Sequence, residues 1–325
     1  MTFGFLYDQI FHREDLKPII DFYPEILSIK GFAFRLSMVF LLLFINYLLE
    51  SIKWQFFIGK LEKVSLVNAY KAVLTGVSIS MFMPNRVGDY MGRVFILKKA
   101  NRIRAIISTI LGTMSQLITT LLFGSIALLI VFPVYMDMSA QINVWIYTGL
   151  WVVVIIGDFT IVFFYLNFGA FTSVIKRISG KGYRKIKKYA DVFSLYNSKD
   201  MLFVLMISIL RYLVFSLQFY MLLTIFKVEI SYFNAMVLVS LIYLVMAIIP
   251  TVALTEIGVR GSVSIFIFSY YFTLFGITTL NQELAVASAS TALWLINLVI
   301  PASVGAIFVF SLKFFRKKPI NGKLD

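Results

Sequence analysis

A cluster of charged residues follows a proline at the end of an apolar run in the first third of the chain. The cluster contains Arg86, Asp89 and Arg93, and it comes directly after Pro84. A guanidinium group is a planar fork of N–H donors that fits phosphate oxygens, and a nearby carboxylate can orient it or contact a cationic headgroup. These residue types, with Gly88 among them, favour the binding of a charged polar group.

A second cluster of this kind occurs 166 residues later. Pro250 ends another apolar run, and a predicted loop over 251–261 follows, which contains Glu256, Gly258 and Arg260. The two stretches share five identical residues at this offset: Ser65, Asn68, Ala69, Val73 and Pro84 match Ser231, Asn234, Ala235, Val239 and Pro250. The repetition indicates an internal repeat with one polar break in each half.

Each cluster also has a purely structural explanation. Arg86, Asp89 and Arg93 are the residues expected where a loop lies on the cytoplasmic side of a membrane. Glu256 and Arg260 are four residues apart, which is the spacing of an ion pair at the start of a helix. The sequence alone leaves the binding and the structural explanations open.

The composition places these clusters in a membrane protein. Of 325 residues, 60% are hydrophobic and only 14% are charged, and the mean hydropathy is +0.89. A soluble domain of this length would be closer to half apolar. The chain has no cysteine, and its one histidine, His12, lies outside every predicted span, so we predict no metal site and no cofactor.

Apolar runs long enough for a helix alternate with short polar segments, which predicts an all-α, polytopic membrane fold. The run 32–58 ends in Glu50, Lys53 and Trp54, a group typical of the membrane interface. Asp158 and Arg211 lie inside other spans, and we predict that they form a structural buried ion pair.

Basic residues are distributed unevenly along the chain. Residues 84–104, 167–200 and 313–325 hold 19 of the 30 lysines and arginines, whereas 132–143 and 276–284 hold none. By the positive-inside rule the basic segments are cytoplasmic, which places the C-terminus inside and the N-terminus outside. We expect the membrane to be the cytoplasmic (inner) membrane of a bacterium. Each proline break then belongs to a hairpin, and the two hairpins insert from opposite faces as an inverted repeat, which is compatible with re-entrant hairpins. Two full spans per hairpin, or one span with a surface segment, remain alternatives.

These predictions divide the chain into segments with different roles. We expect one transmembrane domain over 32–312 between an interfacial N-terminal segment and a basic cytoplasmic tail. Within 176–188, an apolar stripe opposite basic residues favours a helix lying on anionic lipid, although a solvated loop helix fits equally well. The segments are 1–31 (N-terminal segment), about 36–131 (repeat 1), 143–166 (connecting span), 167–200 (basic loop), about 201–312 (repeat 2) and 313–325 (tail).

The stretch from Phe82 to Arg93 resembles the P-x-R-x-G-E-x-x-R block of the lysylphosphatidylglycerol synthase transmembrane, or flippase-like, family. The stretch from Pro250 to Arg260 resembles that family's second block, P-x-G-x-G-x-R-E. Asp89 stands where the family usually has Glu, and Gly261 replaces the final Glu of the second block. No soluble aminoacyl-transferase domain follows in this sequence. The resemblance therefore implies the lipid-handling part of the family without the synthase activity.

The leading hypothesis is a flippase-like protein, not an enzyme, that binds and translocates a phospholipid or lipid-linked precursor. An intramembrane lipid-modifying transferase is the main alternative, and a non-catalytic membrane partner subunit is another. No nucleotide-binding motif of the G-x-x-x-x-G-K-[ST] type is present, and no nucleic-acid partner is expected. The sequence does not identify the lipid or the oligomeric state. We further expect that the polar breaks of both hairpins bound one shared cavity.

Overall fold

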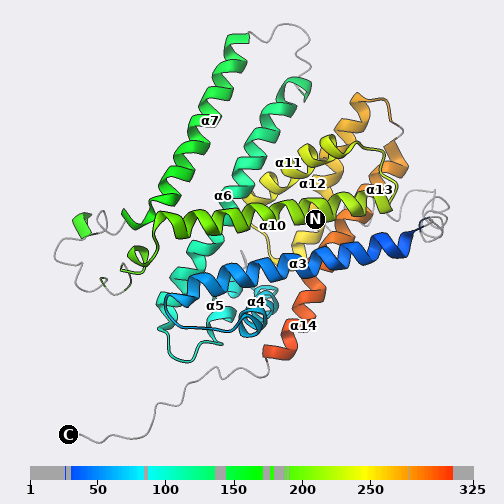
Figure 1. Ribbon diagram of the computed structural model, residues 1–325. Helices are drawn as coiled ribbons and strands as arrows, with labels where there is room; N and C mark the ends of the chain where they lie inside the picture. The colour runs from blue at the N-terminus through cyan, green and yellow to red at the C-terminus, as the bar shows by residue number, and fades with distance from the viewer. Residues whose placement is uncertain are drawn as a thin grey trace, which may run out of the picture.

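The structure is a computed structural model that describes residue 26 and residues 31–83, 87–135, 144–170, 176–178, 187, 189, 191–277 and 279–309. Within this part of the chain, every regular element is a helix (Figure 1). Six of the helices are long and apolar enough to cross a membrane. The prediction of an all-α, polytopic membrane protein is confirmed.

The helices follow one another in two successions of similar order, separated by α7 (Val144–Leu166). In each succession, a helix of 28 residues precedes a shorter helix that ends at a polar break. The first contains α3 (Phe32–Gly59), α4 (Leu66–Ser80), α5 (Val87–Val94) and α6 (Arg102–Tyr135). The second contains α10 (Ser198–Ile225), α11 (Tyr232–Ile248), α12 (Ala253–Leu274), α13 (Thr279–Trp294), a π-helix (Leu295–Val299) and α14 (Ile300–Val309). This order agrees with a repeat, while the opposite membrane orientations of the two halves stay a prediction.

The two short helices, α4 and α11, begin with the same cap. Ser65 Oγ accepts a hydrogen bond from the Asn68 backbone N–H, and Ser231 Oγ accepts one from that of Asn234, both at 3.4 Å. A cap of this kind satisfies one of the free N–H groups in the first turn of a helix. The residues that match between the two halves of the sequence therefore include these helix starts.

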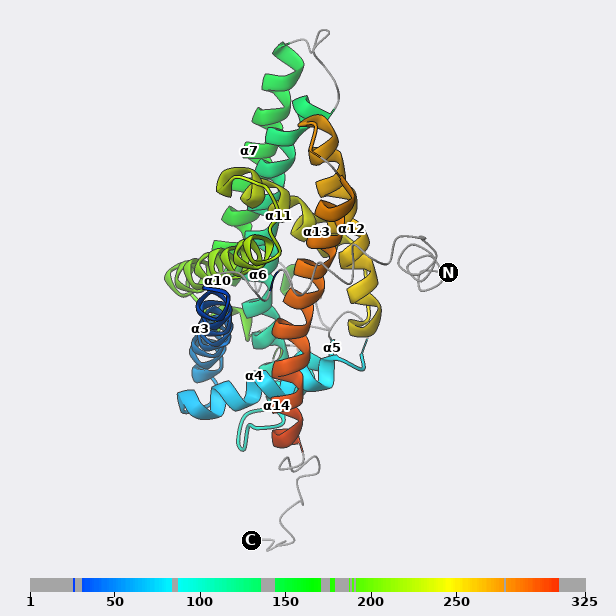
Figure 2. The ribbon, with the colours of Figure 1, turned by 90° about the vertical axis from the view of Figure 1, so that its right-hand side faces the viewer.

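The packing brings the two long helices, α3 and α10, together. They run side by side across the molecule in Figure 1 and are seen nearly end-on in Figure 2. The largest apolar cluster lies among α10, α11, α12 and α13, with Phe219, Ile242 and Phe268 fully buried. In contrast, α7 makes its main contacts with α6 and α10, and its large apolar side chains are mostly exposed. An exposed apolar helix of this length suits a lipid environment.

The first hairpin consists of α4 and α5, and its second helix is short. α5 has 8 residues, whereas a helix needs about 20 to cross a membrane. It packs closely on α4, and its two glycines make this possible. A Cβ added to Gly88 would lie 2.7 Å from the Ile79 carbonyl oxygen, and one added to Gly92 would lie 2.8 Å from Gly76 Cα. Close backbone contact through glycines is typical of helix packing in membranes.

The second break is shorter than the sequence suggested. We expected a loop over 251–261, but α12 begins at Ala253, so the prediction of a loop was wrong. Thr255 Oγ1 accepts a hydrogen bond from the Val252 backbone N–H at 3.3 Å and so caps the new helix. Glu256, Gly258 and Arg260 consequently lie in the first turns of a helix.

A π-helix separates α13 from α14, and Pro301 lies two residues after its end, in the first turn of α14. Proline has no N–H, so the carbonyl four residues earlier, that of Asn297, loses its usual helical donor. The Tyr47 hydroxyl of α3 donates a hydrogen bond to this carbonyl oxygen at 2.6 Å. A side chain of the neighbouring helix α3 thus satisfies the carbonyl group at the distortion. Backbone polar groups within a membrane need such hydrogen-bond partners.

Several predicted segments lie outside the described residues. They are the N-terminal segment 1–31 apart from residues 26 and 31, most of the basic stretch 176–188, and the tail 313–325. Pro84 and Arg86 also lie outside the described residues.

Candidate functional site

A cavity of about 210 Å³ lies between the helices of the two halves. Its lining comes from α3, α6, α10, α11, α12, α13 and the π-helix. The charged residues that line it are Arg211 of α10 and the pair Glu256 and Arg260 of α12. Asn297 and Trp294 add polar groups to the wall. The second polar break therefore delivers its two charged residues to an internal cavity.

Arg260 is the cationic group whose hydrogen bonds are least satisfied in this cavity. Its residue is only 9% exposed, and Nη2 donates to Glu256 Oε1 at 2.5 Å. Nε and Nη1 of the same guanidinium are buried and have no partner in the structure. Buried polar groups are nearly always hydrogen-bonded, and an unsatisfied donor in a dry environment is costly. The N–H donors of these two nitrogen atoms therefore lack an acceptor, in a residue that lines the cavity.

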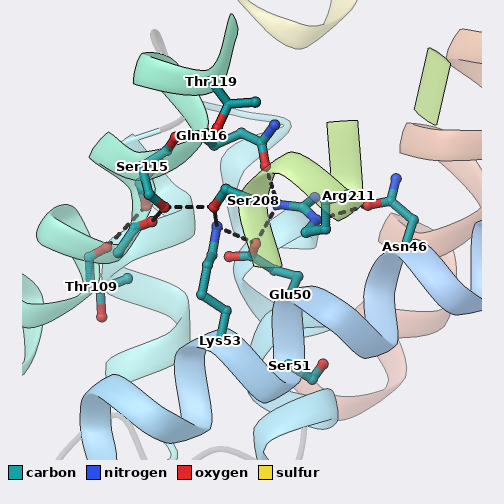
Figure 3. Close-up of polar contacts among 12 residues, drawn as sticks. Asn46, Glu50, Ser51, Lys53, Thr109, Ser115, Gln116, Thr119, Ser208 and Arg211 are labelled. Carbon is teal, nitrogen blue, oxygen red and sulfur yellow. Dashed lines mark hydrogen bonds and ion pairs between the residues drawn. The ribbon is translucent and has the colours of Figure 1, made fainter. Parts of the chain in front are cut away.

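Arg211 lines another part of the cavity and is held by three side chains (Figure 3). Nε donates to Asn46 Oδ1 at 2.8 Å, and Nη1 donates to Gln116 Oε1 at 3.2 Å and to Glu50. Glu50 is 4% exposed and the Arg211 side chain is 20% exposed, so the ion pair between them is partly buried. This set of contacts fixes the position of the Arg211 guanidinium beside the cavity.

Glu50 accepts from two further cations. Arg93 Nη1 lies 2.5 Å from Glu50 Oε1, and Lys53 Nζ lies 2.9 Å from Glu50 Oε2. Arg93 also binds Asp89 with both Nε and Nη2, at 2.8 and 2.6 Å. Three basic side chains thus share one carboxylate, and the contacts run from the first hairpin through Glu50 to Arg211 at the cavity. We call this group the ionic cluster; it consists of Glu50, Lys53, Asp89, Arg93 and Arg211.

The polar contacts extend from Lys53 to the neighbouring helices. Lys53 Nζ donates to Ser208 Oγ at 3.4 Å, and Ser208 Oγ lies 2.6 Å from Ser115 Oγ. All three residues are buried, and Figure 3 shows them between α3, α6 and α10. A buried charge needs such partners, since isolated charges in a membrane are very unfavourable.

The predicted residues of the first hairpin do not line the cavity where the structure describes them. Asp89 and Arg93 lie in the ionic cluster behind it, and Gly88 serves the packing of α5 on α4. In the second half, Pro250 is exposed between α11 and α12, and Gly258 is half-buried on α12.

The prediction of one cavity bounded by both breaks is therefore wrong for the described part of the first break. The ends of the two hairpins nevertheless meet. Val77 and Met81, near the end of α4, pack in one apolar cluster with Ala253 and Ile257 at the start of α12. The apolar contact brings the breaks together, while among the described residues only the second break contributes charged side chains to the cavity lining.

The predicted ion pair between Asp158 and Arg211 is also wrong. Arg211 pairs with Glu50, and Asp158 accepts a hydrogen bond from Ser125 Oγ of α6 at 2.8 Å. Depth in the membrane was inferred from distance along the chain, which gives no information about the direction in which a helix face points. α7 packs on α6, so the Asp158 carboxylate lies beside the Ser125 hydroxyl of that helix.

Sequence reasoning missed the central carboxylate. Glu50 and Lys53 were interpreted as an interfacial anchor group, but they are 4% and 2% exposed, and Trp54 is 2% exposed. Asn46, Glu50 and Lys53 are spaced by four and three residues, so they lie on one helical face. That spacing of polar residues within an apolar run was the available signal. Among the described residues, no group of three acidic or imidazole side chains could hold a metal ion.

Comparison with known proteins agrees with the membrane fold. No curated protein and no solved structure matches the chain. A model of the family described as the lysylphosphatidylglycerol synthase TM region matches residues 26–289, which include both hairpins, the ionic cluster and most of the cavity wall. The chain belongs to the lysylphosphatidylglycerol synthase TM region family.

Proposed function

We propose that the protein is a flippase-like translocase that binds a phospholipid or a lipid-linked precursor by its phosphate and carries the headgroup across the cytoplasmic membrane. The observation that carries this proposal is that two buried guanidinium nitrogens of Arg260 have no partner, in a residue that lines a cavity among membrane-spanning helices. A phosphodiester has the charge and the oxygen geometry that a guanidinium fork binds.

The size of the cavity supports a headgroup as the ligand. Pockets for drug-sized molecules measure roughly 300–1,000 Å³, and this one measures about 210 Å³. A headgroup fits such a space, while the acyl chains would stay in the lipid around the helices. Arg211 and Arg260 would then neutralise the phosphate during its passage, which lowers the cost of moving a charge through hydrocarbon.

The ionic cluster provides a physical link for the movement. The first hairpin is tied through Arg93 to Glu50, and Glu50 is tied to Arg211 in the cavity wall. A displacement of one hairpin would thus be transmitted to the cavity. Alternate exposure of the headgroup to the two faces of the membrane is the mechanism expected of a repeat with two such breaks. We propose no nucleotide hydrolysis and no chemical change of the lipid.

The test is a lipid movement assay on the purified full chain in proteoliposomes. Fluorescent phospholipid in the inner leaflet should become accessible to an external quencher faster than in protein-free vesicles, and mass spectrometry should recover the lipid unchanged. Unaltered accessibility would contradict the proposal, and recovery of a modified lipid would favour a transferase instead.

A further inference from the structure

The charges around the cavity are not balanced. Among the described residues, the cavity wall and the ionic cluster behind it contain four basic side chains and three carboxylates. The basic residues are Lys53, Arg93, Arg211 and Arg260, and the acidic ones are Glu50, Asp89 and Glu256. One positive charge is therefore left over in a region of low dielectric, where an opposite charge is strongly favoured.

Every one of these carboxylates already has a cationic partner. Glu256 is bound by Arg260, Asp89 by Arg93, and Glu50 by three basic side chains. Glu256 is also the only carboxylate of the described residues that lines the cavity. A cationic ligand would have to compete for it with an arginine four residues away on the same helix.

The unpartnered polar atoms of the wall define the ligand further. The donors are Nε and Nη1 of Arg260 and Nε1 of Trp294, all buried and without a partner. The one acceptor of this kind in the lining is Asn297 Oδ1, and its residue is 8% exposed. Asn297 Nδ2 is engaged, since it donates to the Leu293 carbonyl at 3.2 Å. Among its buried, unpartnered atoms, the described wall thus offers several donors to an anion and one neutral acceptor to a hydroxyl group.

We infer that the cavity selects a lipid whose headgroup is an anionic phosphodiester with a small, uncharged, hydroxyl-bearing substituent, and that it discriminates against a cationic, aminoacylated headgroup. The phosphate oxygens accept from Arg260 and Trp294, and the substituent hydroxyl donates to Asn297 Oδ1. This inference rests on the proposed function, because it assumes that this cavity receives the headgroup. It goes beyond that function by fixing the charge of the substrate.

The test compares three acyl-labelled lipids in the same phosphatidylcholine proteoliposomes. Phosphatidylglycerol is anionic and hydroxylated, phosphatidylcholine is zwitterionic without a hydroxyl group, and lysylphosphatidylglycerol is cationic. The initial rate of leaflet exchange should be about tenfold higher for phosphatidylglycerol than for lysylphosphatidylglycerol, with phosphatidylcholine between them. Binding is measured separately, by native mass spectrometry of the protein released from nanodiscs that contain all three lipids.

Asn297→Asp provides the critical variant. It adds a carboxylate of nearly the same shape to the cavity wall, so the preference for phosphatidylglycerol over lysylphosphatidylglycerol should fall about tenfold in both measurements. Asn101→Asp is the matched control. Asn101 is exposed, and its Oδ1 accepts from backbone N–H groups at the start of α6, where aspartate serves equally well. This control should keep the preference of the unmodified protein.

The outcomes separate the inference from the proposed function. Equal rates and equal binding for the anionic and cationic lipids would overturn the inference and leave translocation intact. Selective binding of phosphatidylglycerol without leaflet exchange would uphold the inference and overturn translocation. A preference for the cationic lipid, or an unchanged preference in Asn297→Asp, would show that the charge of this wall does not select the headgroup.

Discussion

At the scale of single residues, Glu50 determines how the charged groups of this protein are arranged. One buried carboxylate contacts Lys53, Arg93 and Arg211, which come from three different helices. Breaking a buried ion pair by removing one partner typically costs about 3–5 kcal/mol, because the other charge stays buried without compensation. The arrangement is therefore expected to be sensitive to the loss of this one group.

A double-mutant cycle tests which carboxylate pairs with Arg211. Glu50→Gln and Arg211→Gln should be coupled, with an interaction free energy of about 0.5–3 kcal/mol in the free energy of unfolding in mixed micelles. Asp158→Asn and Arg211→Gln should be additive within about 0.5 kcal/mol, because the two residues do not share a partner. Coupling between Asp158 and Arg211 would contradict the contacts described above.

The sequence predicted some of these residues and not others. Glu256 and Arg260 were recognised because a charge next to a proline break is unusual in an apolar chain, and the structure places both at the cavity. Glu50 was not recognised, because an acidic residue near the end of a predicted span resembles an interfacial one. Which charge neutralises which other charge depends on the rotation of each helix about its axis, and one sequence does not determine that rotation.

At the scale of elements, the first hairpin depends on glycines. A Cβ on Gly88 would lie within 3 Å of the backbone of α4, which has no flexible end that could move away. Gly88→Ala should therefore separate α5 from α4 and lower the melting temperature of the protein in detergent. Gly149→Ala is the control, because a Cβ there meets nothing within 4 Å, and alanine is the better helix former. Equal melting temperatures for the two variants would show that the α4–α5 contact contributes nothing to stability.

The π-helix offers a second test at this scale. Tyr47→Phe removes the donor to the Asn297 carbonyl and should lower the free energy of unfolding by about 1–3 kcal/mol. Pro301→Ala restores a backbone N–H that can serve the same carbonyl, so Tyr47→Phe should cost less in that background. The two free energies are compared by unfolding in mixed micelles. The same cost in both backgrounds would mean that the hydroxyl group acts elsewhere.

Helices were easier to predict than the places where they break. The runs of apolar residues gave the long helices, and the matching Ser and Asn residues marked the starts of α4 and α11. The start of α12 was missed because its first turns contain Thr255, Glu256 and two nearby glycines, which suggest a loop. The structure shows that Thr255 caps the helix, and capping depends on backbone geometry as well as on residue type.

At the scale of the whole molecule, the orientation in the membrane is a prediction that rests on the distribution of basic residues. A tag inserted within 176–188 or placed at Asp325 should be inaccessible to a membrane-impermeant reagent in intact cells, whereas one at Asp137 should react. Permeabilised cells serve as the control, since all three tags should then react. Labelling of Asp325 in intact cells would reverse the orientation and remove the support for hairpins that insert from opposite faces.

The ionic cluster and the cavity together join the two halves of the chain. The first hairpin contributes Arg93 to the ionic cluster, the second contributes Arg260 to the cavity, and Glu50 with Arg211 connects them. The central claim is that the Arg260 guanidinium binds a lipid phosphate as the headgroup crosses the membrane. The fork geometry of that guanidinium, and not only its charge, is essential to this claim.

The most direct measurement is the initial rate of phosphatidylglycerol exchange between leaflets for Arg260→Lys in proteoliposomes. Lysine keeps the positive charge and removes the fork, so the rate should fall by about tenfold or more while expression and the melting temperature stay close to those of the unmodified protein. Arg35→Lys, at the start of α3 and away from the cavity lining, should leave the rate unchanged. A rate for Arg260→Lys equal to that of Arg35→Lys would contradict the account.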